Sequence, residues 1–229
     1  MMDELYLPDQ GDGSYRNPVL CCDYSDPDVI RVGDTYYMTA SSFNYVPGLP
    51  ILTSADLVNW RLVNYALPNI PEPGYEIPRH ACGVWAPAIR WHDGFFYIYY
   101  GMPDEGIYMV RAADACGQWD APKLVRAGKG LIDPCPFWDD DGRAYVIHAY
   151  ANSRIGFKSR IGIFPMSADG THAIGEGKFL FDGTANHPTI EGPKVYKRDG
   201  WYYIFAPAGG VATGWQTVLR SRRIDGEYE

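Results

Sequence analysis

The stretch SDPDVIRVGDTYYMTAS (residues 25–41) contains the pattern that decides the fold. An Asp-Pro pair opens it, and two runs of strand-forming residues then flank a Gly-Asp turn, which predicts a β-hairpin. Asp26 and Asp28 stand on either side of the proline, where a strand would begin. Asp28 would point to the same side of an alternating strand as Asp26 and could support it, but we expect it to make local hydrogen bonds. The position of Asp26 is explained by matching segments later in the chain.

The same pattern occurs three more times when the prolines are superposed. The matching segments are WAPAIRWHDGFFYIYYG (85–101), IDPCPFWDDDGRAYVIHAY (132–150) and EGPKVYKRDGWYYIFAPA (191–208). Each hairpin is followed by a further strand pattern and a common ending, a Ser or Ala and then Asp, as in LTSADLVNW (52–60). Four strands in each unit, with a period of roughly 45 to 60 residues, predict the blades of a β-propeller.

The predicted architecture is therefore all-β. We expect a single propeller domain over residues 1–229, with blades at about 17–65, 80–128, 129–182 and 188–229. A β-sandwich is the alternative, but a sandwich gives no reason for the strand-opening motif to recur. No segment of convincing length has the period of a helix.

Composition and charge limit the classes of partner. The net charge of −8 and the lack of clustered Lys and Arg exclude a nucleic-acid partner. No run approaches 18 apolar residues, so no membrane partner is expected, and the acidic N-terminus lacks the pattern of a secretion signal, which favours a cytoplasmic location. Five cysteines without a C-x-x-C spacing indicate free thiols in a reducing compartment.

The first strand of each predicted blade lines the central channel, and these strands all start on one face. Just before the superposed prolines stand Asp26, Ala86, Asp133 and Gly192, with Glu191 one position earlier than Gly192. Three carboxylates from three blades are thus expected to converge. An Asp before a Pro is often only a turn residue, but the equivalence of the three positions favours a shared site. Glycosidic bond cleavage needs such a cluster, because one carboxyl donates a proton while another activates water or attacks the sugar.

These motifs make the sequence resemble glycoside hydrolase family 43, from Asn17 to the last residue. The resemblance implies a five-bladed propeller that removes arabinose or xylose with inversion. On the matching motifs, Asp26 would be the general base, Asp133 the residue that orients the acid and tunes its pKa, and Glu191 the general acid. Related retaining hydrolases carry an N-D-P-N-G opening and an E-C pair, neither of which occurs here.

Sugar sites combine aromatic platforms with a few polar groups. Phe43 and Tyr45 in the loop SSFNYVPGLPI (41–51) and Trp85 at the second strand opening are therefore predicted to bind substrate. The resemblance places aromatic side chains at the positions of Phe43 and Trp85. Arg79 and His80, in a long insertion, are candidates for contact with the next sugar of the substrate.

The resemblance also raises the question of a metal ion and of ring closure. Some family members hold calcium in the channel through a histidine of the fifth blade, and no fifth blade follows the four units. No cofactor and no metal site are therefore predicted. The chain is expected to be truncated before a fifth blade, with ring closure by four blades or by a partner chain as the alternatives, and the loss of a blade would weaken the grip on substrate. The incomplete ring is expected to favour self-association, because the flanks of its end blades would be uncovered.

The function predicted from these residues is an inverting exo-acting glycoside hydrolase. Its expected partner is an oligosaccharide that carries terminal α-L-arabinofuranose or β-D-xylose. Two alternatives stay open, a non-catalytic carbohydrate-binding propeller and an endo-arabinanase of the same family.

Overall fold

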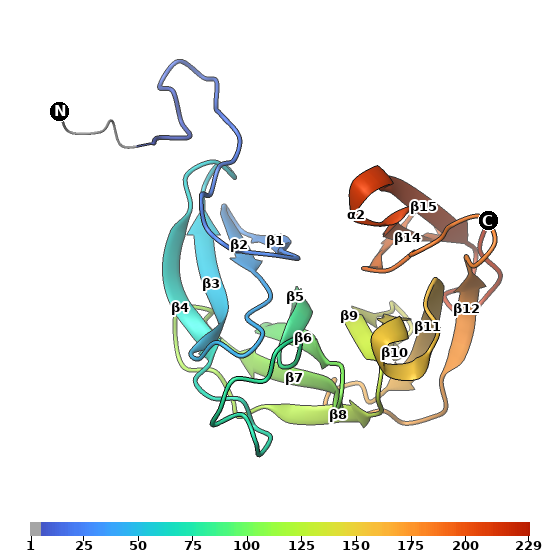
Figure 1. The fold of residues 1–229 in the computed structure, drawn as a ribbon. Helices are drawn as coiled ribbons and strands as arrows, with labels where there is room; N and C mark the ends of the chain where they lie inside the picture. The colour runs from blue at the N-terminus through green and yellow to red at the C-terminus, as the bar shows by residue number, and fades with distance from the viewer. Residues whose placement is uncertain (1–5) are drawn as a thin grey trace.

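The computed structural model describes residues 6–229, and β-sheet dominates it (Figure 1). Every sheet is antiparallel and follows chain order. The first blade contains β1 (Asp28–Val32), β2 (Thr35–Thr39), β3 (Gly48–Ser54) and β4 (Arg61–Leu67). The second contains β5 (Trp85–His92), β6 (Phe95–Met102), β7 (Gly106–Ala112) and β8 (Lys123–Ala127).

The third and fourth blades differ in strand number. The third contains β9 (Leu131–Trp138), β10 (Ala144–Tyr150), β11 (Arg160–Met166) and β12 (Lys178–Asp182). The fourth contains β13 (Lys194–Arg198), β14 (Trp201–Ala208) and β15 (Trp215–Ser221). The expectation of four strands in every unit is thus wrong for the last blade within residues 6–229. After the turn at 222–226, only Glu229 exchanges backbone hydrogen bonds with Arg220 beside β15.

The hairpin turns follow from the Asp-Gly pairs. In the second and fourth blades, the register closes β5 onto β6 and β13 onto β14 across two residues. Both turn residues have positive φ, 45° and 80° at Asp93 and Gly94, and 51° and 73° at Asp199 and Gly200. A two-residue turn of this geometry matches the twist of the strands, and Asp or Asn followed by Gly adopts it readily.

The sheets are arranged around a common axis as the blades of a propeller (Figure 1). The first strand of each blade is innermost, and β1 lies against β5, β5 against β9 and β9 against β13. The ring is open between the first blade and the fourth (Figure 1). The predicted all-β propeller with four blades is confirmed.

Apolar side chains fill the space between successive blades. Ile51, Tyr100 and Val110 belong to the cluster between the first two blades, and two further clusters lie between the second and third and between the third and fourth. Because inner blades are covered on both faces, β6 reads FFYIYYGM, and all of its residues except Phe95 are buried.

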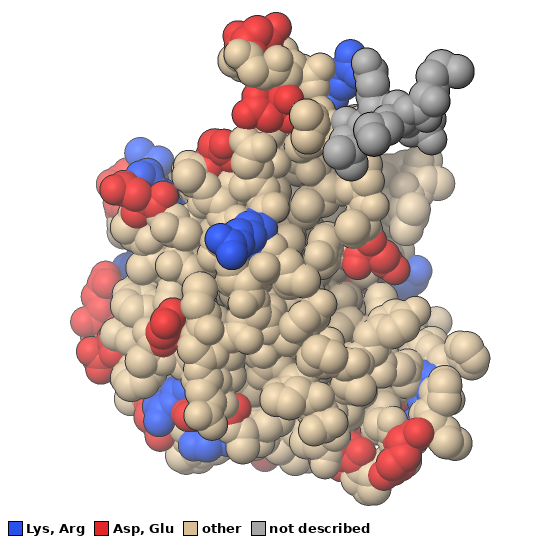
Figure 2. All heavy atoms as spheres, turned by 90° about the vertical axis from the view of Figure 1, so that its left-hand side faces the viewer, with Lys and Arg blue, Asp and Glu red and all other residues tan. Residues whose placement is uncertain are grey.

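Helical structure is limited to short turns in the loops. Within the described residues it amounts to α1 (Asn152–Ile155) and α2 (Gly210–Thr213). No helix in this part of the chain has the length and apolar character needed to cross a membrane. On the face of the first blade shown in Figure 2, basic residues are scattered singly among uncharged and acidic ones.

Candidate active site

The residue before each repeat proline has an unusual backbone conformation. Its φ is 50° at Asp26, 30° at Ala86, 54° at Asp133 and 59° at Gly192. A residue that precedes proline is normally extended with negative φ. In β5 and β9 the pairing register also shifts at this position. A bulge redirects the side chain of its extra residue, so β5 and β9 each turn one side chain at the start of the strand away from the usual alternation.

A cavity of about 460 Å³ lies at these strand starts. Several predicted residues line it together: Asp26, Phe43, Trp85, Asp133 and Glu191. The three carboxylates are thus brought to one place by three different blades. The sequence reasoning did not single out Lys194 and Pro207, which also line the cavity. Lys194 directly follows the fourth repeat proline, just as Asp28 directly follows the first. This equivalence in the repeat could have identified Lys194.

Two serine hydroxyls hold the carboxylate of Asp26. Ser41 donates to Oδ2 at 2.8 Å and Ser25 donates to the same oxygen at 3.2 Å. The Ser41 oxygen also accepts a 2.8 Å hydrogen bond from the backbone N–H of Ala86, which fixes its orientation. Asp26 is exposed, so its carboxylate is both oriented and open to water. These are the properties required of a group that activates a water molecule.

Asp133 is the most enclosed of the three carboxyl groups, with 6% of its surface exposed. Its Oδ2 accepts a 2.8 Å hydrogen bond from the backbone N–H of Gly192. Burial and the neighbouring Glu191 carboxylate raise the pKa of Asp133 to about 7, although the Gly192 N–H and the charge of Lys194 act in the opposite direction.

Glu191 lies on the segment before β13, and its backbone N–H donates to the carbonyl of Pro207 at 3.2 Å. Burial raises the pKa of Glu191; the charge of Lys158 lowers it, and Asp26 raises it further. Two neighbouring carboxyl groups with raised pKa values titrate as a coupled pair. Asp133 and Glu191 therefore compete for a proton.

Below the carboxylates, Asp28 is buried and makes contacts across blades. It accepts hydrogen bonds from the backbone N–H of Ile89 at 2.9 Å and from Nη1 of Arg90 at 2.6 Å. Its other oxygen lies 3.7 Å from Nζ of Lys194. The expectation of local hydrogen bonding for Asp28 is therefore wrong: its partners lie on β5 and β13, and a buried carboxylate requires cationic partners such as these.

Phe43 and Trp85 form apolar walls of the cavity. Phe43 has a φ of 49° and pairs through its backbone with Val84, which joins the first-blade loop to the start of β5. The guanidinium of Arg154 lies over the Trp85 ring at 5.4 Å, and a bidentate contact with Asp104 holds it there. Both aromatic rings are thus supported by neighbouring loops.

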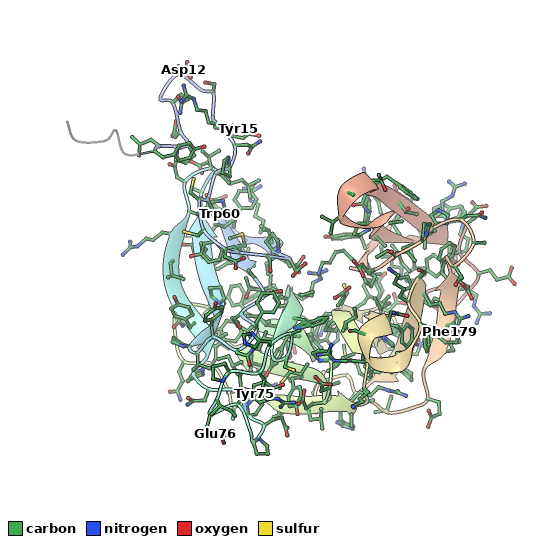
Figure 3. All side chains as sticks on the ribbon, viewed as in Figure 1. Asp12, Tyr15, Trp60, Tyr75, Glu76 and Phe179 are labelled. Atoms are coloured by element: carbon green, nitrogen blue, oxygen red, sulfur yellow. The ribbon has the colours of Figure 1, made fainter. Side chains whose placement is uncertain are left out.

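Tyr45 and His80 line a second hollow of about 610 Å³, and Phe43 borders both spaces. Arg79 is positioned differently. Its Nη1 lies 3.4 Å from Oε1 of Glu105, and its guanidinium lies 4.4 Å from the centre of the Tyr75 ring. Figure 3 labels Tyr75 in the insertion that carries Arg79 and His80. This insertion is therefore beside the 460 Å³ cavity, with the Arg79 side chain already paired.

Among residues 6–229, no group of three or more His, Cys, Asp or Glu side chains is arranged to hold a metal ion.

Comparison with known proteins agrees with this architecture. The family model described as Glycosyl hydrolases family 43 matches residues 15–229. A Xylanibacter ruminicola protein whose name refers to β-xylosidase activity is 48% identical over 222 residues, 96% of this chain and 40% of that protein. A non-reducing end α-L-arabinofuranosidase of Bacteroides ovatus is 33% identical over 226 residues, 94% of this chain and 40% of that protein.

A solved structure shares the same backbone arrangement. The crystal structure of a xylan β-1,4-xylosidase from Bacillus halodurans superposes with a TM-score of 0.80 at 32% identity, covering 93% of this chain and 42% of that one. The chain spans about two fifths of the length of these relatives.

Proposed function

The chain belongs to glycosyl hydrolases family 43, and from this premise we propose that it carries the catalytic propeller of an inverting, exo-acting glycoside hydrolase. The proposed substrate is an oligosaccharide with a terminal β-D-xylose or α-L-arabinofuranose. The names of the relatives support both sugars, since one refers to β-xylosidase activity and another to α-L-arabinofuranosidase activity.

One observation carries the proposal: Asp26, Asp133 and Glu191, from three blades, line a single cavity. The residues are more than 50 positions apart in the chain, and the repeat geometry brings them together at the strand starts. A binding protein has no need for a partly buried carboxyl group with a raised pKa, whereas a general acid at neutral pH does.

In the proposed reaction, Glu191 protonates the glycosidic oxygen as the bond from that oxygen to the anomeric carbon breaks. Asp26 accepts a proton from a water molecule as the water oxygen bonds to the same carbon from the opposite face. The products are one free sugar with inverted configuration and the shortened oligosaccharide, with one water consumed. An inverting mechanism requires the carboxyl groups of Asp26 and Glu191 to stand about 6.5 to 9.5 Å apart, to leave room for that water.

The shape of the site favours release of a single terminal sugar. The cavity of about 460 Å³ is bounded by Phe43 and Trp85, whose rings suit the apolar face of a pyranose or furanose. The second hollow beyond Phe43 would take the following sugar units, near Tyr45 and His80.

The test is hydrolysis of p-nitrophenyl β-D-xylopyranoside and p-nitrophenyl α-L-arabinofuranoside by the wild type, Glu191→Ala and Asp26→Asn. We expect both variants to lose at least about 100-fold in kcat/KM, because each removes one partner in proton transfer. Glu176→Ala is a matched control, since its carboxylate is fully exposed between β11 and β12. Proton NMR of the first-formed sugar should show inverted anomeric configuration.

Three results would contradict the proposal. Full activity of Glu191→Ala would show that Glu191 is not the general acid. Binding of xylo-oligosaccharides without any turnover by the wild type would favour a carbohydrate-binding propeller, and internal cleavage of arabinan into mixed oligosaccharides would favour an endo-arabinanase.

A further inference from the structure

Lys194 brings a positive charge to a cavity that otherwise gathers carboxylates. Its side chain is 22% exposed and lines the cavity together with Asp133 and Glu191. Nζ is held from below, 3.7 Å from Oδ1 of Asp28 and 3.4 Å from the carbonyl oxygen of Pro87. The ammonium is therefore fixed in place, because its partners belong to buried strands of other blades.

The ion pair between Asp28 and Lys194 also joins the two ends of the ring. Asp28 is on β1 and Lys194 on β13, the innermost strands of the first and fourth blades, between which the ring is open (Figure 1). The chain reaches Asp26 two residues before Asp28, and Glu191 three residues before Lys194. The segments that bear the proposed base and the proposed acid are thus linked directly below the cavity.

We propose that Lys194, held by Asp28, is a positioning residue that shifts the shared proton of the carboxyl pair from Asp133 toward Glu191. This inference rests on the proposed function, because it assumes that Glu191 must be protonated for the reaction. Lys194 acts through Asp133 and Glu191 and takes no part in bond making or breaking.

The distribution of charge supports this role. The other titratable groups around the cavity and its floor are Asp26, Asp28, Arg90, Asp133, Cys135, Lys158 and Glu191. Asp28 and Arg90 are paired with each other at 2.6 Å, and Nη2 of Arg90 donates to Sγ of Cys135 at 3.0 Å. Lys194 is therefore the cation that faces the carboxyl pair from the channel side.

The two cations near the pair act on different carboxyl groups. Lys194 lowers the pKa of Asp133, whereas Lys158 lowers the pKa of Glu191. Lys158 is exposed on the loop after α1, so water and salt screen its charge, while Lys194 is mostly enclosed. Lys194 therefore shifts the shared proton from Asp133 toward Glu191, against the effect of burial on Asp133. Without Lys194, burial would hold the proton more strongly on Asp133.

The experiment compares Lys194→Met with Lys194→Arg in the whole chain, using pH profiles of kcat/KM on the two p-nitrophenyl glycosides. For Lys194→Met we expect the plateau of kcat/KM to fall about tenfold. The alkaline limb of the profile should move up by about half to one pH unit, because the last proton of the carboxyl pair leaves at higher pH without the cation. Lys194→Arg keeps the charge, so the alkaline limb should stay in place and the plateau should recover.

Folding is not at risk in this design, because Asp28 keeps its 2.6 Å contact with Arg90 when Lys194 is replaced. Circular dichroism melting of both variants checks this, and Lys123→Met, on the exposed start of β8, is the matched control. A merely structural role for Lys194 would lower activity or melting temperature without moving the alkaline limb.

An unchanged alkaline limb in Lys194→Met would overturn the inference, as would a rise in KM alone, which would show that the ammonium contacts the sugar. Glu191→Ala is measured in parallel. If that variant keeps wild-type activity, the proposed function itself fails. If it loses activity while the Lys194→Met profile is unmoved, only the role of Lys194 fails.

Discussion

The backbone N–H of Gly192 donates a 2.8 Å hydrogen bond to Oδ2 of Asp133. This contact couples the strand start of the fourth blade to that of the third, one residue away from Glu191. This hydrogen bond stabilises the ionised form of Asp133, whereas burial destabilises that form. The position and the protonation of the proposed acid therefore depend on a neighbouring blade.

Replacing Gly192 should damage this coupling. Gly192 has a φ of 59°, and a Cβ there would lie 3.5 Å from Cδ of Pro207, so the backbone conformation is the main obstacle. We expect Gly192→Ala to destabilise the protein by about 1 kcal/mol and to lower kcat at least tenfold. Gly33→Ala is the matched control, with a φ of 60° in a hairpin turn and open space around its Cβ. Equal activity losses in both variants would contradict the coupling.

The stability of the protein should fall as pH rises through the titration range of Asp133. The folded-state pKa is about 7 and the unfolded value is near 3.8, so the folded state binds the proton more tightly. The resulting stabilisation is complete below about pH 4 and is lost as pH rises to about 7, up to about 4 kcal/mol. Urea unfolding at several pH values should show that Asp133→Asn flattens this part of the profile. An unaltered slope would contradict the raised pKa.

Loss of the proposed acid should depend on the leaving group. With 2,4-dinitrophenyl xyloside, departure needs little protonation, so Glu191→Ala should lose far less activity than with xylobiose. The ratio of kcat/KM for the two substrates, in the variant and the wild type, measures this. The same loss on both substrates would argue that Glu191 acts in binding.

The hydroxyl of Ser41 should orient the proposed base. Ser41→Ala removes a 2.8 Å hydrogen bond to Asp26 and leaves the N–H of Ala86 without its acceptor. We expect kcat to fall about tenfold with little change in KM. Ser25→Ala removes the longer 3.2 Å bond and is the control, with a smaller expected loss. A larger loss of kcat in Ser25→Ala than in Ser41→Ala would show that Ser25, and not Ser41, orients Asp26.

Self-association stays a prediction, and the fourth blade offers a surface for it. On its outer face, Phe205 is paired in register with Val218 and lies 5.7 Å from the ring of Tyr196; all three side chains are exposed. Because exposed apolar patches favour association, sedimentation velocity should detect dimers or larger species, and Phe205→Lys should shift the distribution toward monomer. A monomeric wild type at all concentrations would contradict this prediction.

The propeller and the meeting of three carboxylates could be predicted from the sequence, because a repeated strand opening reveals which chain segments occupy equivalent positions. The repeat alone was enough to identify Asp26, Asp133 and Glu191. The ion pair of Asp28 with Lys194 could not be predicted, since it depends on how two non-adjacent blades face each other across the axis.

Local sequence also gave no sign of the backbone geometry at these positions. A residue before proline is expected to be extended, whereas the structure places it at positive φ in every blade. The bulges in β5 and β9 that accompany this conformation arise from pairing with the adjacent strand, which a linear pattern does not record.

The shared conformation at the four strand starts makes the cavity modular. Each blade offers one equivalent attachment point at the start of its inner strand, and two of these points, Asp26 and Asp133, bear carboxyl groups. Ala86 occupies the corresponding point of the second blade with a side chain too small to react. Evolution or a protein engineer could install a new functional group there, Asn or Asp most readily, while the rest of the scaffold stays unaltered.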